Sequence, residues 1–99
     1  MRYHYIVSYD ICDPHRLRRV HRTMRDFGDG VQLSVFACQL SDRDLAVLQC
    51  RLLEILNQRE DQVLFIKLGQ ADGAGDEPPP RCSVLGRRLA PGLARLLVV

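Results

Sequence analysis

The chain has 99 residues, 46% of them hydrophobic and 26% charged, with a formal net charge of +2. This length supports a single core and excludes a second catalytic domain. No apolar run approaches the roughly 20 residues of a membrane-spanning helix, and the first residues lack a signal-peptide pattern, so we expect a cytoplasmic protein.

Two residue types stand out in the composition. Of the 14 basic residues, Lys67 is the one lysine. Arginine presents a planar fork of donors that suits phosphate oxygens, although a coding bias toward arginine would give the same count. The cysteines form no CxxC pair, which favours reduced, buried side chains over a zinc site. They are Cys12, Cys38, Cys50 and Cys82.

The first expected element is a strand over residues 3–10, whose aromatic and β-branched residues suit a packed, pleated surface. Alternation gives it two faces, with Tyr3, Tyr5, Val7 and Tyr9 on one and His4, Ile6, Ser8 and Asp10 on the other. Both faces carry apolar groups, so we expect a central strand covered on each side. Asp10 lies at the strand end, where it either begins a turn or takes part in chemistry.

Asp13 and Pro14 are typical of the start of a helix, as N-cap and first helical residue. We expect this helix to end at Gly28 as C-cap, with Asp29 and Gly30 continuing the turn. Its buried stripe comprises Leu17, Val20, His21, Met24 and Phe27, with His21 packed at the edge rather than binding a metal. The remaining faces carry Arg16, Arg18, Arg19, Arg22 and Arg25.

Residues 31–40 are extended in character, either as one long strand or as a hairpin with its turn near Phe36 and Ala37. Ser41 to Asp44 then resembles a capping box. It opens a second helix that ends near Asn57. The apolar stripe of that helix comprises Leu45, Leu48, Leu52, Ile55 and Leu56.

In the last third of the chain, apolar runs predict strands, and a Gly- and Pro-rich run predicts a linker between them. Residues 63–68 read as a buried strand stopped by Gly69. Residues 70–82 contain a Gly- and Pro-rich run and are expected to form a flexible linker within a single domain spanning 1–99. A short strand follows at 83–85, and an apolar strand at 95–99 must pair with its own sheet or with that of a partner.

This order of elements predicts the α+β class, as a ferredoxin-like βαββαβ sandwich with additional C-terminal strands. Two helices cover only one face of such a sheet. Because the strands are apolar on both faces, we expect the second face to meet another copy of the chain in a two-fold homodimer.

Several pieces of the chain resemble a known family, the small CRISPR-associated adaptation protein with a ferredoxin-like fold that partners the CRISPR integrase. They keep the order and spacing of that family over nearly the whole chain. The pieces are Tyr9-Asp10-Ile11, Arg19-Val20, Gln32-Leu33-Ser34-Val35-Phe36, Asp61-Gln62-Val63, Leu68-Gly69 and Val84-Leu85-Gly86. One departure is Gly30, which stands where many relatives carry an arginine.

The resemblance implies a dimer in which Asp10 of both subunits holds Mg²⁺ or Mn²⁺, and in which the C-terminal strands cross to the partner. Mg²⁺ prefers oxygen ligands and keeps several waters, so two carboxylates on a two-fold axis would suffice. We therefore take Asp10 as the catalytic and metal-binding residue. Ser8 could bond a metal-bound water or serve as an interface hydroxyl. Tyr9 and Phe36 could stack on bases or pack in the core.

The Arg-rich helix has two interpretations, a solvated face or a surface that follows phosphates without reading bases. The candidates for the second are Arg16, Arg18, Arg19 and Arg22.

The function expected is CRISPR adaptation, by a metal-dependent endonuclease that binds nucleic acid and bridges integrase subunits. We expect double-stranded DNA as the nucleic acid, with single-stranded RNA as the alternative. Two alternative functions stay open: a non-catalytic DNA-binding adaptor and a toxin-type ribonuclease of the same fold.

Overall fold

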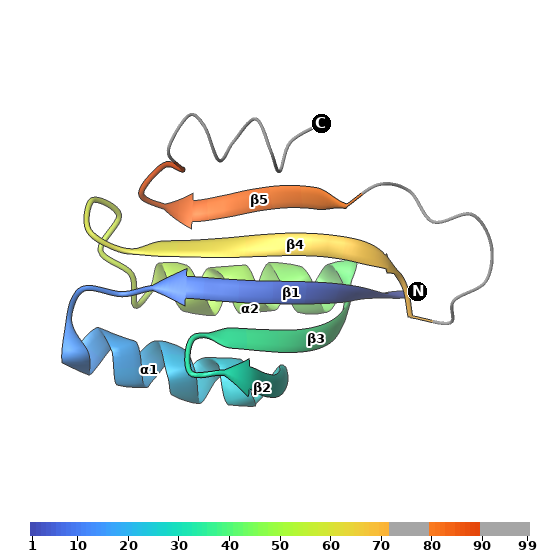
Figure 1. Cartoon of the computed structure of the whole chain (residues 1–99), viewed down its shortest axis with the longest axis horizontal. Helices are drawn as coiled ribbons and strands as arrows, with labels where there is room; N and C mark the ends of the chain where they lie inside the picture. Colours follow the sequence, from blue (N-terminus) through green and yellow to red (C-terminus); the bar gives the residue numbers. More distant parts are fainter. Residues whose placement is uncertain (72–79, 90–99) are drawn as a thin grey trace.

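The computed structural model describes residues 1–71 and 80–89, which form an antiparallel sheet and two helices (Figure 1). In chain order the elements are β1 (Arg2–Asp10), α1 (Pro14–Arg25), β2 (Gly28–Gln32), β3 (Val35–Ser41), α2 (Asp42–Leu53), β4 (Gln62–Gln70) and β5 (Arg81–Gly86). The sheet has the order β2-β3-β1-β4-β5. This arrangement confirms the predicted ferredoxin-like α+β fold. Neither helix of the described ranges is long and apolar enough to cross a membrane.

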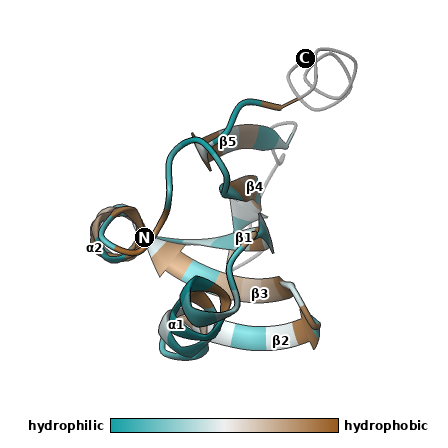
Figure 2. Ribbon diagram, turned by 90° about the vertical axis from the view of Figure 1, so that its left-hand side faces the viewer, coloured by the Kyte–Doolittle hydropathy of each residue, from teal (hydrophilic) through white to brown (hydrophobic). Residues whose placement is uncertain are grey.

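Strand β1 is the centre of the sheet because it pairs with both β3 and β4. Its residue Val7 lies opposite Phe36 on one side and Phe65 on the other, and all three side chains are buried. Both helices pack on this side of the sheet (Figure 2). The core that results comprises Tyr5, Val7, Tyr9, Val20, Met24, Phe36, Cys38, Leu40, Leu48, Leu52, Leu56, Val63 and Phe65.

The opposite side of the sheet, here called the open face, carries neither of the two helices of the described ranges (Figure 2). The strand register places six half-buried apolar side chains on it: Ile6, Val35, Ala37, Leu64, Ile66 and Val84. We expected β1 to be covered on both sides. Within this chain the two helices cover it on one side. Asp10 shares the open face by alternation.

Helix α1 begins as predicted, with the Asp13 side chain accepting a hydrogen bond from the Arg16 backbone N–H over 2.9 Å. Its end was predicted wrongly, because the C-cap is Asp26 and Gly28 opens β2. Gly28 pairs with Cys38 so closely that a Cβ would collide with the Ala37 carbonyl. Close backbone approach, and not a left-handed cap, is what requires glycine there.

The hairpin of residues 31–40 turns at Leu33 and Ser34, earlier than the predicted Phe36 and Ala37. Phe36 is 1% exposed and lies well inside β3, whereas the Leu33 side chain is 86% exposed. The apolar alternation of the sequence continues through the turn at Leu33. The turn was therefore predicted too late in the chain.

Helix α2 begins with the predicted capping box, in which Ser41 and Asp44 each accept a hydrogen bond from the other's backbone N–H. It ends at Leu53, before the predicted Asn57, although Leu56 beyond it is still buried. Strand β4 continues through Gly69, the residue that was predicted to stop it.

Three residues of the predicted linker 70–82 are in strands instead, because Gln70 belongs to β4, and Arg81 and Cys82 belong to β5. Residues 72–79 of that prediction lie outside the described residues. The short strand predicted at 83–85 is confirmed as part of β5. The strand expected at 95–99 lies outside the described residues. The four cysteines are free thiols, and the expectation that all are buried fails for Cys12 and Cys50, which are exposed.

Candidate functional site

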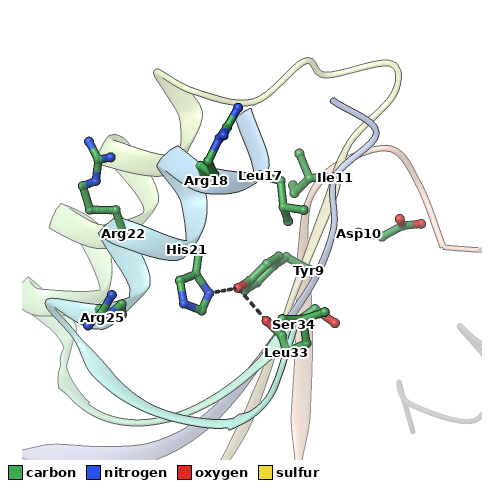
Figure 3. Close-up of a pocket in the computed structure, with 10 residues that line it drawn as sticks. All are labelled: Tyr9, Asp10, Ile11, Leu17, Arg18, His21, Arg22, Arg25, Leu33 and Ser34. Carbon is green, nitrogen blue, oxygen red and sulfur yellow. Dashed lines mark hydrogen bonds between the residues drawn. The ribbon is translucent and has the colours of Figure 1, made fainter. Parts of the chain in front are cut away.

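Strand β1 ends with two of the predicted site residues, whose side chains point to opposite sides of the sheet (Figure 3). Tyr9 points toward α1, whereas Asp10 points away from the helices. This follows from the alternation of side chains along a strand. The strand end therefore has a phenol on its helix side and a carboxylate on its open side.

The Asp10 side chain is 70% exposed, and its Oδ2 accepts a hydrogen bond from Arg87 Nη2 over 2.8 Å. Arg87 directly follows β5 and is held by its own backbone, whose N–H donates to the Asp61 carbonyl over 2.7 Å. Its carbonyl accepts from the Gln62 side-chain amide over 2.9 Å. Sequence reasoning did not single out Arg87, because the pair joins residues 77 positions apart.

The fit of a metal ion at this place depends on the number of available ligands. A carboxylate is the ligand type that Mg²⁺ prefers. However, no group of three or more His, Cys, Asp or Glu side chains with metal-binding geometry occurs in ranges 1–71 and 80–89. Asp10 of one chain thus has the right chemistry but too few companions.

Arg16, one of the four predicted nucleic-acid contacts, forms ion pairs with two acidic residues of the same chain. Its Nε donates to Asp61 over 2.7 Å and its Nη2 donates to Glu60 over 2.9 Å. The hydrogen bonds to Asp61 raise the pKa of the Arg16 guanidinium. Arg16 therefore joins the start of α1 to the loop before β4, and it is less available to phosphates than the other three arginines.

Asp61 is the buried centre of that connection, with a fully buried side chain. Besides Arg16, it accepts hydrogen bonds from the backbone N–H groups of Cys12 and Asn57, each over 2.9 Å. Burial opposes the charge on Asp61, but these hydrogen bonds outweigh burial and lower its pKa. The sequence analysis named Asp61 only as part of the family piece Asp61-Gln62-Val63 and assigned its carboxylate no role.

The exposed side of α1 is strongly basic. Four of its arginines are exposed, and none of them forms an ion pair with another residue in the described part of the chain: Arg18, Arg19, Arg22 and Arg25. Because their charges are unpaired, they are available to bind anions. Arg18, Arg19 and Arg22 were among the predicted nucleic-acid contacts, whereas Arg25 was not.

A cavity of about 520 Å³ lies between α1, the end of β1 and the hairpin turn (Figure 3). It is lined by Tyr9, Asp10, Ile11, Leu17, Arg18, His21, Arg22, Arg25, Leu33 and Ser34. Leu17 was predicted to be buried, but it is 37% exposed because it faces this cavity. We call this cavity the α1 pocket.

Tyr9 organises the wall of the α1 pocket. Its hydroxyl lies 3.1 Å from the Leu33 carbonyl and 2.9 Å from Nδ1 of His21, as the dashed lines in Figure 3 show. Burial raises the pKa of Tyr9, so the hydroxyl keeps its proton. A histidine at the edge of the helix stripe was predicted, whereas its tyrosine partner was not.

The supporting residues fall on different sides of the sheet. Phe36 is buried, and its ring lies 6.2 Å from the ring of Tyr9 and 5.3 Å from that of His21. Core packing is thus the role that the structure favours for Phe36. Ser8 lies half-buried on the open face, opposite Val35. Gly30 is exposed in β2, with room for a side chain.

The fold and this site define a small ferredoxin-like protein that has an acidic strand end beside a basic helix. Residues 1–73 match the family described as CRISPR associated protein Cas2. The chain belongs to this family, and the predicted resemblance is confirmed.

Relatives and solved structures agree with this assignment. A CRISPR-associated endoribonuclease Cas2 of Geobacter sulfurreducens is 38% identical over 99 residues, which is 100% of both chains. Another, of Rhodospirillum rubrum, is 48% identical over 69 residues, 69% of this chain and 67% of the relative. The structure of Streptococcus pyogenes Cas2 covers 63% of this chain and 81% of its own, with a TM-score of 0.59 and 31% identity. A hypothetical protein of Thermus thermophilus gives a TM-score of 0.68 at 33% identity, covering 82% and 100%.

Proposed function

We propose that this chain acts in CRISPR adaptation as a metal-dependent nuclease that hydrolyses phosphodiester bonds as a two-fold homodimer. The observation that carries the proposal is the position of Asp10, an exposed carboxylate at the end of the central strand, on the open face. The family supports the activity, since the relatives from Geobacter sulfurreducens and Rhodospirillum rubrum bear the name endoribonuclease.

The open face supports the dimer. Its apolar side chains, among them Ile6, Leu64 and Ile66, are only half-buried within one chain. A contiguous apolar patch of this kind is typical of a surface that meets another protein. In a two-fold pair the same patch is used by both copies, so whatever lies near the axis occurs twice. Two copies of Asp10 would then supply two carboxylates to one metal ion.

In such a dimer the paired Asp10 carboxylates would hold Mg²⁺ or Mn²⁺. When bound, the ion supplies positive charge to the phosphodiester and lowers the pKa of a bound water. Arg87 now neutralises Asp10, so it would have to share or release the carboxylate. Its guanidinium would then lie close to the scissile phosphate, a group that it can bind through its planar fork.

The exposed arginines of α1 form the nucleic-acid surface in this proposal. Arg18, Arg19 and Arg22 are free to contact phosphates, and the dimer would double their number. Contacts of this kind give affinity without sequence readout. They suit double-stranded DNA as well as single-stranded RNA.

A second candidate function is that of a non-catalytic adaptor, which holds duplex DNA and bridges subunits of the CRISPR integrase. The ion pair between Asp10 and Arg87 favours it, because it leaves the carboxylate partly neutralised. A toxin-type ribonuclease differs from both candidates in cutting RNA alone.

The test replaces Asp10 by Asn and uses Asp29→Asn, an exposed acid of β2, as the matched control. Cleavage of single-stranded RNA and of duplex DNA is measured with Mg²⁺ and with Mn²⁺, and the mass in solution is measured by sedimentation. We expect a dimer, and a loss of cleavage of at least about 100-fold in Asp10→Asn, since its carboxylate carries the chemistry. Asp29→Asn should cut like the unchanged protein.

The outcomes separate the candidates. No cutting by the unchanged protein on either substrate, together with tight duplex binding, would overturn the nuclease in favour of the adaptor. Cutting of RNA alone would show a ribonuclease, the activity that the names of the relatives give, and would exclude DNA as the substrate. Full activity in Asp10→Asn, or a protein that remains a single copy, would remove the proposed site.

A further inference from the structure

We propose that the α1 pocket binds one unpaired nucleotide, with its base against the apolar wall and its phosphate on the arginines of the rim. This inference rests on the proposed nucleic-acid function and assigns a further site to it. The pocket lies on the helix side of the sheet, whereas Asp10 points to the open face (Figure 3). Asp10 belongs to the lining of the pocket, but its side chain points away from α1, so the contacts proposed here do not use the catalytic carboxylate.

The wall of the pocket is apolar where a base would lie. Leu17 and Leu33 are 37% and 86% exposed, and both line the pocket together with Ile11. Figure 3 shows Leu17 beside Ile11 and close to the ring of Tyr9. Exposed leucines on two different elements that face one cavity favour a ligand with a flat apolar surface, because covering them removes apolar area from water.

The polar groups of the wall are arranged to accept a hydrogen bond. The Tyr9 hydroxyl has a single proton, and the Leu33 carbonyl 3.1 Å away can only accept it. Nδ1 of His21, 2.9 Å from the same oxygen, must then carry its own hydrogen and donate it. In the neutral imidazole this leaves Nε2 of His21 as an acceptor. The exocyclic amino group of a base is a donor of the kind that it would accept.

The rim is positively charged. Arg18, Arg22 and Arg25 recur at helical spacing along α1, line the pocket, and are exposed without an ion-pair partner in the described ranges. Together they complement a phosphate, which arginine binds through two parallel hydrogen bonds. An apolar wall with a cationic rim fits a nucleoside monophosphate unit better than a neutral ligand or a bare anion.

The size of the pocket also selects its ligand. A volume of about 520 Å³ lies within the range of small-molecule sites, roughly 300–1,000 Å³. A base that is paired and stacked within a duplex cannot leave the helix without unstacking. The site would therefore take a nucleotide from a single strand or from a frayed end. Because Tyr9 and Asp10 are neighbours, a strand anchored here passes the end of β1.

The first experiment uses adenosine 5′-monophosphate, with ribose 5-phosphate and inorganic phosphate as probes that lack the base. Amide signals of the ¹⁵N-labelled protein are followed by NMR during each titration. We expect saturable shifts at Leu33, Ser34 and Arg22 with the nucleotide. Affinity for ribose 5-phosphate should be at least about tenfold lower, because it leaves the apolar wall uncovered. Equal affinities for all three probes would overturn the proposal, and so would the absence of saturable shifts.

The second experiment changes the wall. Leu33→Asp removes an apolar contact with the base and adds a negative charge to the site of an anionic ligand, so we expect nucleotide affinity to fall about tenfold or more. Leu53→Asp, which alters an exposed leucine of α2, is the matched control and should stay within about twofold. Both positions are exposed, so neither change should unfold the protein. Equal effects of the two changes would overturn the proposal.

A third arm identifies the source of the nucleotide. Fluorescence anisotropy compares a single-stranded hexamer with a blunt hairpin duplex, each with the unchanged protein and with Leu33→Asp. We expect Leu33→Asp to weaken the single strand and to leave the duplex nearly unchanged. If it weakens mononucleotide binding alone, the ligand is a free nucleotide and the strand proposal fails. Cleavage with Mg²⁺ and Mn²⁺ is measured separately from nucleotide binding, so failure of the proposed catalysis would be distinguished from failure of this site.

Discussion

Arg16 and Asp61 join the first helix to the loop before β4 through an ion pair of 2.7 Å, in which the Asp61 side chain is fully buried. Each oxygen of Asp61 accepts two N–H groups, one from the backbone and one from Arg16. These four donors compensate the buried charge, and the ion pair would be broken by removing either the carboxylate or the guanidinium.

We therefore expect Asp61→Asn to lower the free energy of unfolding by about 3 kcal/mol, because a buried pair loses one partner. The matched control is Glu60→Gln. Glu60 is the second partner of Arg16, but its side chain is 56% exposed. This change should cost less than about 1 kcal/mol. Urea unfolding at pH 7 measures both. Similar losses in the two variants would show that burial of Asp61 does not set its contribution.

The Asp61 carboxylate should also make the free energy of unfolding depend on pH. The pKa of Asp61 is lower in the folded protein than its ordinary value, so the unfolded chain takes up a proton more readily. The contribution of Asp61 is complete above the unfolded pKa, about 4, and is lost as the pH falls through the lowered folded pKa. Unfolding free energies between pH 7 and pH 3 should decline more steeply below about pH 5 in the unchanged protein than in Asp61→Asn.

Asp13 and Asp44 also have lowered pKa values, because each is hydrogen-bonded near a helix start. Both remain in the Asp61→Asn variant, so the difference between the two curves isolates Asp61. Parallel curves would contradict its assigned role.

Gly86 ends β5 with a φ of +85°, and a Cβ there would collide with the Asp61 carbonyl. We expect Gly86→Ala to destabilise the protein by more than about 1 kcal/mol, because both the backbone angle and the space are unsuitable. Gly30→Ala is the control, since its nearest neighbour is the Phe36 ring at 3.8 Å and its φ is not positive. Thermal unfolding should separate the two, and equal midpoints would contradict the collision.

Arg87 should compete with a metal ion for Asp10. Its guanidinium occupies one carboxylate oxygen over 2.8 Å, so we expect Arg87→Ala to bind Mn²⁺ more tightly, as measured by the electron paramagnetic resonance of free Mn²⁺. The effect should vanish in Arg87→Ala combined with Asp10→Asn. Because the pair is largely exposed, stability should change by less than about 1 kcal/mol. Weaker Mn²⁺ binding in Arg87→Ala would contradict competition.

Arg19→Ala combined with Arg22→Ala should weaken duplex binding and lower its salt dependence, because each lost phosphate contact removes about 0.9 from the logarithmic salt slope. The matched control replaces two exposed arginines away from α1, Arg43 and Arg59. Binding is measured by anisotropy between about 50 and 200 mM salt. An unchanged slope in the α1 variant would assign the DNA surface elsewhere.

Sequence reasoning succeeded where the signal is local. The caps at Asp13 and Ser41 depend on partners within three residues, so their pattern is visible in the chain itself. The ferredoxin-like order follows from the succession of elements. The hairpin turn was misplaced because Leu33 continues an apolar alternation although its side chain is exposed.

In the candidate site, too, sequence reasoning found what is local in the chain and missed what depends on distant partners. Asp10 could be found because it ends a strand, a feature of the sequence. Asp61 and Arg87 could not, since their partners lie tens of residues away and only the folded chain brings them together. The α1 pocket likewise needs β1, α1 and the hairpin turn at once, so no window of sequence contains it.

The hairpin turn is fixed to β1 at two points: Tyr9 N–H donates to the Ser34 carbonyl over 3.0 Å and its hydroxyl donates to the Leu33 carbonyl. The wall of the α1 pocket and the end of the central strand are therefore one rigid piece. A nucleotide would enter without waiting for the hairpin to swing aside, so its arrival and departure should be fast, limited by diffusion and by rearrangement of the arginine side chains.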